Sequence, residues 1–208
     1  MIKIQNWGLV EYHKALQRQK LLVQEIQEQR NKNVLVLCQH PPVITIGRNG
    51  GSGNIVSSPD LLEKAGISIC ETDRGGDVTL HNPGQIVGYP IFNLLDYKQD
   101  LHWFLREIEE CIIDTIAIFG LQGGRVSGLT GVWLDENRKI CAMGLHCSRW
   151  VTSHGFALNV NNDLSQFNYI IPCGISDKGV TSISKEINSK VDMNLVEITI
   201  SEIFSKKF

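Results

Sequence analysis

Residues 130–160 constrain the fold more than any other part of the chain. Two β-like segments there, TGVWL (130–134) and KICAMGLHC (139–147), flank a short polar turn at 135–138. This pattern is typical of a β-hairpin, and HGFALNV (154–160) follows it as a further strand. Long helical segments accompany these locally joined strands elsewhere in the chain. The sequence therefore predicts an α/β (α+β) fold, a mixed sheet with helices packed on it.

The rest of the chain alternates between strand-like and helical patterns. Apolar spacing of three to four residues predicts a half-exposed helix over 8–30, and Asp100 caps a second long helix over 100–119. Ser58 and Pro59 are typical of the start of a short helix. Pro90 should push the end of its strand toward an edge or a bulge. The other predicted strands are 33–38, 43–46, 67–71 and 86–92, and the tail holds helices near 181–188 and 194–206.

Composition restricts the class of protein. The chain has 208 residues, of which 42% are hydrophobic, and a net charge of −2, which fits one domain over residues 1–208. It has no basic stripe, no run of about 18 apolar residues and no signal-peptide core at its start. We therefore expect a soluble, cytoplasmic protein that binds neither nucleic acid nor membrane, with a monomer as the default.

The six cysteines are scattered, and none forms a CxxC pair. Neither a zinc cluster nor disulfides are expected, and we predict no metal. Cys38, Cys70 and Cys111 lie in apolar runs and are interpreted as small buried residues. Cys173 differs, because Pro172 and Gly174 flank it. A thiolate could accept an acyl group there if a positive charge lay nearby, but a structural cysteine is the alternative.

Lys139 is the candidate for that positive charge. It opens an alternating run in which Lys139, Cys141 and Met143 would share one strand face, together with Leu145 and Cys147. A lysine on an apolar face is costly unless it is used, so it could stabilise a thiolate and take a proton from an amine. A solvated lysine in a turn is the alternative.

Two glycine-rich segments could form the walls of a site. Residues 74–85 combine paired glycines with polar side chains, and exposed N–H groups there could hold a carbonyl or an oxyanion. Four glycines within residues 47–53 predict a mobile loop. His40, His81 and His154 are dispersed and do not suggest a metal site.

Four stretches together are more specific than any one of them. They are QHPPVITIGR (39–48), RGGDVTLHNPGQIVGYPIFNL (74–94), RKICAMGLHCSRWVTSHGFALNV (138–160) and PCGISDKGVTSI (172–183). In this order the chain resembles the lipoyl(octanoyl) transferase family of lipoate biosynthesis. The resemblance implies a mixed, mainly antiparallel sheet flanked by helices, similar to the catalytic domain of biotin and lipoate ligases.

The resemblance also implies an activity and partners. An octanoyl group would pass from octanoyl-acyl carrier protein to a cysteine, then to a lysine on a lipoyl domain of a 2-oxoacid dehydrogenase or the glycine cleavage H protein. No cofactor is implied. By match, Cys173 is the nucleophile and Lys139 lowers its pKa. The matching substrate-binding residues are Arg74, Gly75, Gly76, Asp77, Val78, Thr79, Leu80, His81, Ala142, Met143, Gly144, Gly155, Phe156 and Ala157.

Some residues of this chain depart from the family pattern, and alternatives remain for the nucleophile and for the function. Leu80 replaces an aromatic residue and Asn82 a glycine, although Asn tolerates a left-handed backbone. Cys141, two residues from Lys139, is a rival nucleophile. An ATP-dependent lipoate or biotin ligase of the same fold is the alternative function, and a non-enzymatic binder of carrier or lipoyl domains is a further one.

Overall fold

The predicted hairpin lies inside a larger, eight-stranded sheet. The computed structural model describes residues 2–174 and 178–208, without the side chain of Cys173. The strands of the main sheet are β1 (Lys3–Leu9), β2 (Val34–Gln39), β6 (Gln85–Ile91), β7 (Gly124–Val126), β8 (Leu129–Trp133), β9 (Arg138–Ser148), β10 (Val151–Asn159) and β11 (Gly179–Val180). Their order is β1-β2-β6-β10-β9-β8-β7, and β11 pairs with β9. Only the β1–β2 and β11–β9 pairs are parallel in this described sheet, so the mainly antiparallel prediction is confirmed.

A smaller sheet lies beside the main one. It has the order β4-β3-β5, with β3 (Val43–Ile46) in the centre, and its outer strands are β4 (Ser68–Glu71) and β5 (Val78–His81). Strand β3 pairs in parallel with β4 and antiparallel with β5. The short turns of 3-10 helix η3 (Leu164–Tyr169) and η4 (Pro172–Gly174) follow β10 in the chain.

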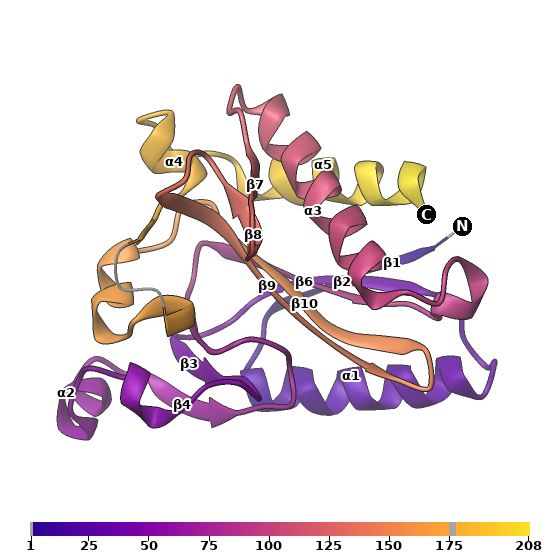
Figure 1. Ribbon diagram of the computed structural model, residues 1–208, viewed down its shortest axis with the longest axis horizontal. Coiled ribbons are helices and arrows are strands. Elements are labelled where there is room, and N and C mark those ends of the chain that lie inside the picture. The colour runs from indigo at the N-terminus through magenta and orange to yellow at the C-terminus, as the bar shows by residue number, and fades with distance from the viewer. Residues whose placement is uncertain (1, 175–177) are drawn as a thin grey trace.

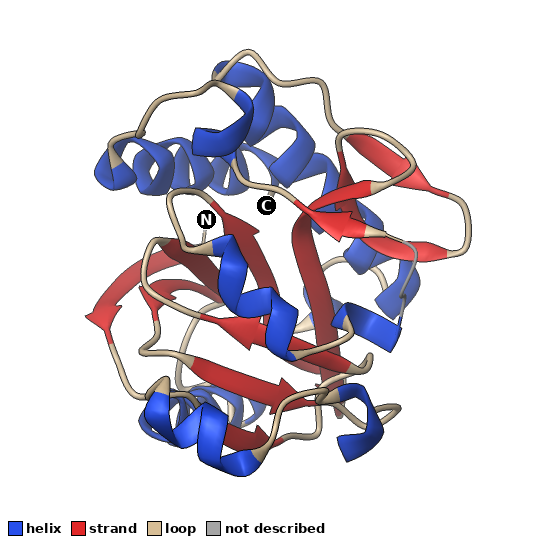
Figure 2. Ribbon diagram, turned by 90° about the vertical axis from the view of Figure 1, so that its left-hand side faces the viewer, coloured by secondary structure: helices blue, strands red, loops and turns tan. Residues whose placement is uncertain are grey.

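Helices cover both faces of the main sheet. The described helices are α1 (Tyr12–Gln27), α2 (Pro59–Lys64), α3 (Leu101–Ile118), α4 (Ile183–Glu186) and α5 (Met193–Lys207), with single turns η1 (Ser52–Asn54) and η2 (Leu94–Asp96). Helix α2 packs Leu62 under the small sheet. Helix α1 runs along one face, and α3 and α5 lie on the other (Figure 1); the strands lie between helices in Figure 2 as well. No helix among the described residues is long and apolar enough to span a membrane.

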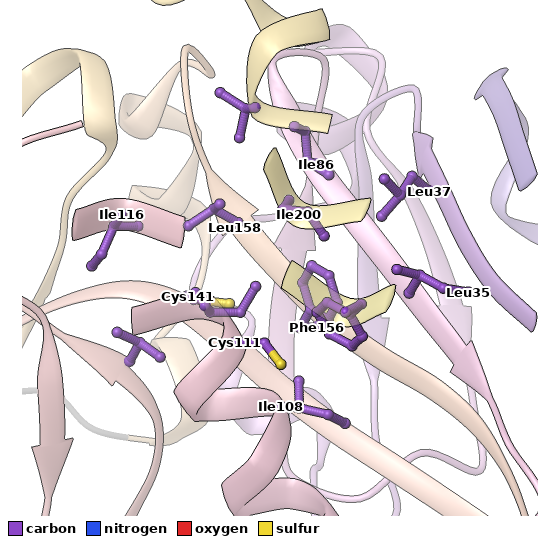
Figure 3. Packing of buried hydrophobic residues seen from close by; sticks show 14 of the residues in the cluster. Leu35, Leu37, Ile86, Ile108, Cys111, Ile116, Cys141, Phe156, Leu158 and Ile200 are labelled. Atoms are coloured by element: carbon purple, nitrogen blue, oxygen red, sulfur yellow. The ribbon is translucent and has the colours of Figure 1, made fainter. Parts of the chain in front are cut away.

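Each face of the sheet has its own apolar core. Buried residues of β2, β9 and β10 such as Leu35, Cys141 and Phe156 pack against Ile108 of α3 and Ile200 of α5 (Figure 3). The opposite face packs residues such as Val36, Val87 and Ala157 against α1. A third cluster, including Ile44, Val78 and Leu80, lies under the small sheet.

The local signals in the sequence match the observed elements closely. The hairpin β8–β9 turns at 135–138 as predicted, and β10 follows it antiparallel. Asp100 caps α3 by accepting the Trp103 N–H, and Ser58 accepts the Leu61 N–H at the start of α2. These features depend on residues within a few positions of each other, which is why the sequence predicts them.

The N-terminal prediction was wrong. Residues 3–9 form edge strand β1 and not the start of a helix, and Leu9 is 63% exposed. Helix α1 begins only at Tyr12, and its buried side includes Gln19, which the sequence suggested would interrupt the apolar stripe. Strand β1 has little apolar alternation and is held by parallel pairing with β2, some 30 positions further along the chain. Local periodicity cannot detect such a partner.

Pro90 lies in a central strand, at a break in the sheet. Strand β6 pairs with β10 only from Gln85 to Gly88. Beyond that point the Thr152 hydroxyl donates to the Pro90 carbonyl at 2.7 Å. Because proline has no N–H to give, it fits where the pairing with β10 has ended, while Pro90 stays in register with Leu35 of β2.

The cysteines have two kinds of environment. Cys38 and Cys111 are buried as predicted, whereas Cys70 of β4 is only partly buried, because β4 is the edge of the small sheet. The described cysteines Cys38, Cys70, Cys111, Cys141 and Cys147 are all free thiols.

Candidate functional site

A cavity of about 580 Å³ lies between the main sheet, the first turns of α1 and α3, and the 74–77 segment. This volume falls within the range of about 300–1,000 Å³ that is usual for small-molecule sites. The predicted site residues that line it are Arg74, Gly75, Gly76, Asp77, Thr79, His81, Lys139, Ala142, Met143, Gly144, Gly155, Phe156 and Ala157. Segments far apart in the sequence thus meet around one space.

The cavity has an exposed rim and a buried end. Its rim is formed by exposed residues that include Arg48, His102 and Thr130. Its buried end is lined by residues that include Tyr12, Thr79, His81, Val87, Tyr89 and Ala157, each at most 7% exposed. An apolar ligand would lose most contact with water by extending from the rim to that end.

Lys139 is buried beside this cavity. Its side chain lines the cavity, and the residue is 7% exposed. Its Nζ lies 4.6 Å from the centroid of the Trp133 ring, close enough for a cation–π attraction. Its carbonyl accepts the Thr181 N–H at 2.9 Å, which ties the chain after β11 to β9. The lysine is therefore held in a defined, largely dry position and is not a solvated turn residue.

A bulge separates Lys139 from Cys141. Cys141 pairs with Val132, but Lys139 pairs with Trp133, so Ile140 is an extra residue in β9. Val132 and Trp133 are consecutive and point to opposite faces of the sheet, and their partners do the same. The prediction that Lys139 and Cys141 share a face was wrong.

Cys141 instead lies in the apolar core. It is 0% exposed and packs below α3 (Figure 3), and burial raises the pKa of its thiol far above the usual value. A thiol without water, and on the face away from Lys139, is a poor nucleophile. The structure thus weighs against Cys141 as the acyl-accepting sulfur.

Arg74 holds the wall of the cavity in place. Its guanidinium donates to the carbonyl and hydroxyl of Thr45 at 2.7 and 2.9 Å, and to the Asp77 carbonyl at 2.6 Å. The Gly75 N–H donates to the Leu145 carbonyl at 2.9 Å. Residues 74–77 are therefore fastened to both β3 and β9.

Gly47 and Gly50, two of the four glycines within residues 47–53, allow close packing against the 74–77 segment. Backbone N–H groups of residues 47–49 donate to carbonyl oxygens of residues 74–77 at 3.0 to 3.2 Å. A Cβ on Gly47 would lie 2.3 Å from the Gly76 carbonyl oxygen, closer than atoms can approach. The first part of the predicted mobile loop is thus bonded to the cavity wall.

Asp77 joins that wall to the segment that contains Cys173. Its carboxylate accepts from the Asn54 amide at 2.5 Å and from the Val78 N–H at 2.8 Å. A Cβ on Gly174, at φ +68°, would lie 2.7 Å from the same carboxylate. The backbone next to Cys173 thus contacts the 74–77 segment, while the Cys173 side chain lies outside the described part of the structure.

Val78 and Leu80 depart from the predicted site. Their side chains do not line the cavity but pack in the third core with Ile44. Thr79 and His81 do line it, because side chains alternate along β5. The substrate-binding prediction for residues 74–81 therefore includes two positions whose side chains support the small sheet.

Two histidines and an aspartate next to this wall were not predicted. The His154 Nε2–H donates to the Asp73 carboxylate at 2.7 Å, and His146 Nε2 lies 3.6 Å from it. Burial lowers the pKa of His154 more than Asp73 raises it. Burial alone would raise the pKa of Asp73, but the bond to His154 and the charges of both histidines lower it overall.

His154 also adopts an uncommon backbone conformation. It has φ +57° within β10 and is 2% exposed. The neighbouring Gly155 approaches the Gly88 carbonyl so closely that a Cβ would lie 2.0 Å from it. A polar residue before a glycine inside a predicted strand was the available signal for this irregularity.

The described histidine, cysteine and acidic side chains do not gather in a group of three that could hold a metal ion. The buried lysine and the shape of the cavity are the features described there that could serve chemistry. A cavity with a buried end and a fixed lysine fits an enzyme that handles an acyl group.

Comparison with known proteins agrees with this class. A model of the "Lipoyl protein ligase A/B catalytic domain" matches residues 11–205. An octanoyltransferase from Solibacter usitatus is 50% identical over 181 residues, which cover 87% of this chain and 81% of that protein. The solved structure of a bi-partite lipoate protein ligase from Thermoplasma acidophilum superposes with a TM-score of 0.76 at 17% identity. The match covers 99% of this chain and 82% of that one. A biotin protein ligase from Aquifex aeolicus has a TM-score of 0.57 at 12% identity, covering 99% and 69%.

The chain belongs to the lipoyl protein ligase A/B catalytic domain family. Within that family its curated relatives at 41–50% identity are named octanoyltransferases, and the predicted class of enzyme, an acyltransferase, is confirmed. The structural neighbours are too distant in sequence to add more than the fold, which they share with this chain.

Proposed function

We infer that this chain transfers an octanoyl group in lipoate biosynthesis. Relatives of high identity over most of the chain are named octanoyltransferases, and residues 1–208 would form one catalytic domain. The observation that supports this best is the bulge of β9. It turns the buried Lys139 to the cavity face, in phase with Ala142 and Gly144.

The proposal includes partners and a compartment. The donor would be octanoyl-acyl carrier protein, and the acceptor a lysine of a lipoyl domain in a 2-oxoacid dehydrogenase or the glycine cleavage H protein. A donor thioester carried on a long arm suits a cavity that opens at an exposed rim. We expect the enzyme to act in the cytoplasm as a monomer, without nucleic acid, membrane or cofactor.

The proposed reaction has two acyl transfers. The Cys173 thiolate attacks the thioester carbonyl of the donor, the bond from carbon to the carrier sulfur breaks, and the carrier leaves as a thiol after taking a proton from Lys139. The acceptor amine then attacks the acyl-cysteine and gives a proton to Lys139. The bond to the Cys173 sulfur breaks and restores the thiolate.

The walls of the cavity suit these steps. The 74–77 segment is held in a fixed position against β3 and β9 by Arg74 and by the Gly75–Leu145 bond, so any donor that it turns toward the cavity is fixed too. Fixed donors stabilise an oxyanion without reorganising during the reaction. The Asp77 carboxylate lies against the backbone of Gly174, the residue after Cys173, so the 74–77 segment and the Cys173 segment are neighbours.

A comparison of two cysteines tests this proposal. The protein is incubated with octanoyl-acyl carrier protein, and its mass is measured before the acceptor is added. We expect an octanoyl adduct that is lost in Cys173→Ala and kept in Cys141→Ala, the matched control. Cys141→Ala should lower stability by about 1–2 kcal/mol, because a buried side chain becomes smaller. An adduct on Cys141 in the unchanged protein would overturn the assignment of the nucleophile.

The same assay separates the transferase from a ligase. An ATP-dependent ligase would need a triphosphate and Mg²⁺ site, and it is the less supported alternative. Octanoate with ATP should give no modified acceptor, whereas octanoyl-acyl carrier protein should. Turnover with octanoate and ATP alone would overturn the transferase.

A further inference from the structure

The buried end of the cavity is closed by aromatic rings. Tyr12 lies parallel to the His81 ring, with centroids 5.6 Å apart and planes at 13°. His40 contacts both rings edge-on, at 5.1 and 5.7 Å, and Tyr89 lies 6.0 Å from His40. We call these four residues, Tyr12, His40, His81 and Tyr89, the aromatic cluster. Of these, Tyr12, His81 and Tyr89 line the cavity directly.

Hydrogen bonds fix the aromatic cluster from behind. The His40 Nδ1–H donates to the Val10 carbonyl at 2.6 Å, and its Nε2 accepts the Tyr89 hydroxyl at 2.7 Å. The His81 Nδ1–H donates to the Gln85 side chain at 2.8 Å. Rings held in this way cannot swing aside without breaking buried hydrogen bonds. The cluster is therefore a firm end wall.

Tyr12 joins the cluster through ring contacts with His40 and His81. It comes from the first residue of α1, whereas His40, His81 and Tyr89 follow or belong to strands of the two sheets. Its ring is 5% exposed and adds bulk at the end of the cavity. A smaller residue there would lengthen the cavity while the hydrogen bonds of His40 and His81 remain.

An alkyl chain is sensitive to such a wall. Each methylene that leaves water stabilises the complex, so a chain extends until it meets the closed end. One methylene too many must displace packed atoms or leave part of the chain outside the buried end.

We propose that Tyr12 sets the longest acyl chain that the enzyme accepts, by ending the cavity against the ring of His81. The proposal rests on the octanoyl transfer inferred above. Val87 and Ala157, paired across β6 and β10 and both lining the cavity, form its side wall near this end. A larger side chain at either position would narrow the cavity near this end.

The test compares acyl chains of different length. The ratios of kcat/KM for hexanoyl, octanoyl, decanoyl and dodecanoyl carrier proteins are measured for the unchanged enzyme and for Tyr12→Leu. We expect Tyr12→Leu to raise the decanoyl-to-octanoyl ratio by about tenfold, as a change of one or two methylenes in a pocket does. Tyr12→Phe keeps the ring and should keep the length preference.

A second variant works in the opposite direction. Ala157→Leu adds bulk to the side wall, and we expect it to raise the hexanoyl-to-octanoyl ratio by about tenfold. The Ala157→Leu variant still tests the proposal if Tyr12→Leu does not fold. The matched control is Tyr97→Leu, which removes a half-buried tyrosine that does not line the cavity and should leave the length profile as it is.

The outcomes separate this proposal from the proposed function. If the unchanged enzyme transfers octanoyl but neither Tyr12→Leu nor Ala157→Leu moves the profile, the role of Tyr12 is overturned and the transferase stands. A profile that moves equally in Tyr97→Leu would also overturn it, because general loosening would be the cause. If the unchanged enzyme transfers no acyl chain, the proposed function and this proposal with it are overturned.

Discussion

At the scale of single residues, Lys139 shows how one extra backbone position can relocate a side chain. Without the bulge at Ile140, alternation would place Lys139 with Cys141 on the core face. With it, the lysine stands over the Trp133 ring and lines the cavity. The aromatic face offers partial negative charge to the ammonium group, which offsets part of the loss of water around it.

We predict that Lys139→Met lowers the rate of octanoyl transfer by about 10²- to 10⁴-fold, the range seen for loss of a proton-transferring group. Folding should persist, because methionine keeps most of the buried stem. The measurement is kcat with octanoyl-acyl carrier protein and a lipoyl domain.

A second lysine beside the same ring is the matched control. Lys178 Nζ lies 5.9 Å from the Trp133 centroid and donates to the Glu136 carbonyl. Lys178→Met should leave the rate of transfer within about twofold, since a surface substitution usually has a small effect. Equal losses in both variants would contradict a specific role for Lys139.

At the scale of elements, the cavity depends on an irregular centre in the main sheet. Strands β6 and β10 separate after Gly88, and β10 bends at His154 with a positive φ. Glycines at 88, 144 and 155 bring three strands and the 74–77 segment into close contact. A regular sheet with side chains at these positions would leave no room for that approach.

We predict that Gly144→Ala displaces the cavity wall. Its Cβ would lie 2.4 Å from the Gly75 carbonyl oxygen, so the 74–77 segment must move. The expected results are a lower kcat/KM and a loss of about 1–3 kcal/mol in the free energy of unfolding, as overpacking causes. Steady-state kinetics and denaturant unfolding measure the two effects.

Gly124→Ala is the control for this change. A Cβ on Gly124 meets no atom within 4 Å, and this glycine lies on β7 at the edge of the sheet. Its stability should change by less than about 0.5 kcal/mol, as is usual for surface sites. If Gly144→Ala behaved like this control, the close contact with Gly75 would not matter for function.

At the scale of the whole molecule, buried histidines couple folding to pH. Burial lowers the pKa of His40 to about 4 and that of His81 to about 3, and it also lowers the pKa of His154. In the unfolded chain the pKa of each histidine would be about 6.5. The folded protein therefore binds fewer protons than the unfolded chain below that pH, and acid favours unfolding.

We predict that the free energy of unfolding is fully retained above pH 6.5 and falls as the pH decreases toward about 4. Each histidine contributes a slope of up to about 1.4 kcal/mol per pH unit. Urea unfolding at several pH values measures the slope. His40→Gln should be less stable at neutral pH but should lose less stability on acidification.

His13→Gln provides the comparison for this prediction. His13 is an exposed residue of α1, so its replacement should leave the dependence on pH almost unchanged. A pH dependence that His40→Gln and His13→Gln altered equally would show that burial of His40 is not its cause.

The sequence alone determined the features that depend on neighbouring residues. The β8–β9 hairpin, the caps at Ser58 and Asp100, and most strands follow from periodicity and turn residues within a few positions. The four motifs also identified the family, because their order and content are specific to it. The site residues predicted from them make up half of the residues that line the cavity.

Only the tertiary structure decided how those residues face one another. The bulge that turns Lys139 to the cavity, the Asp73–His154 bond and the edge strand β1 each depend on a partner far along the chain. The inward packing of Val78 and Leu80 depends on which face of β5 the third core covers. Pairing, register and burial are set by the free energy of the whole fold, so local patterns do not reveal them.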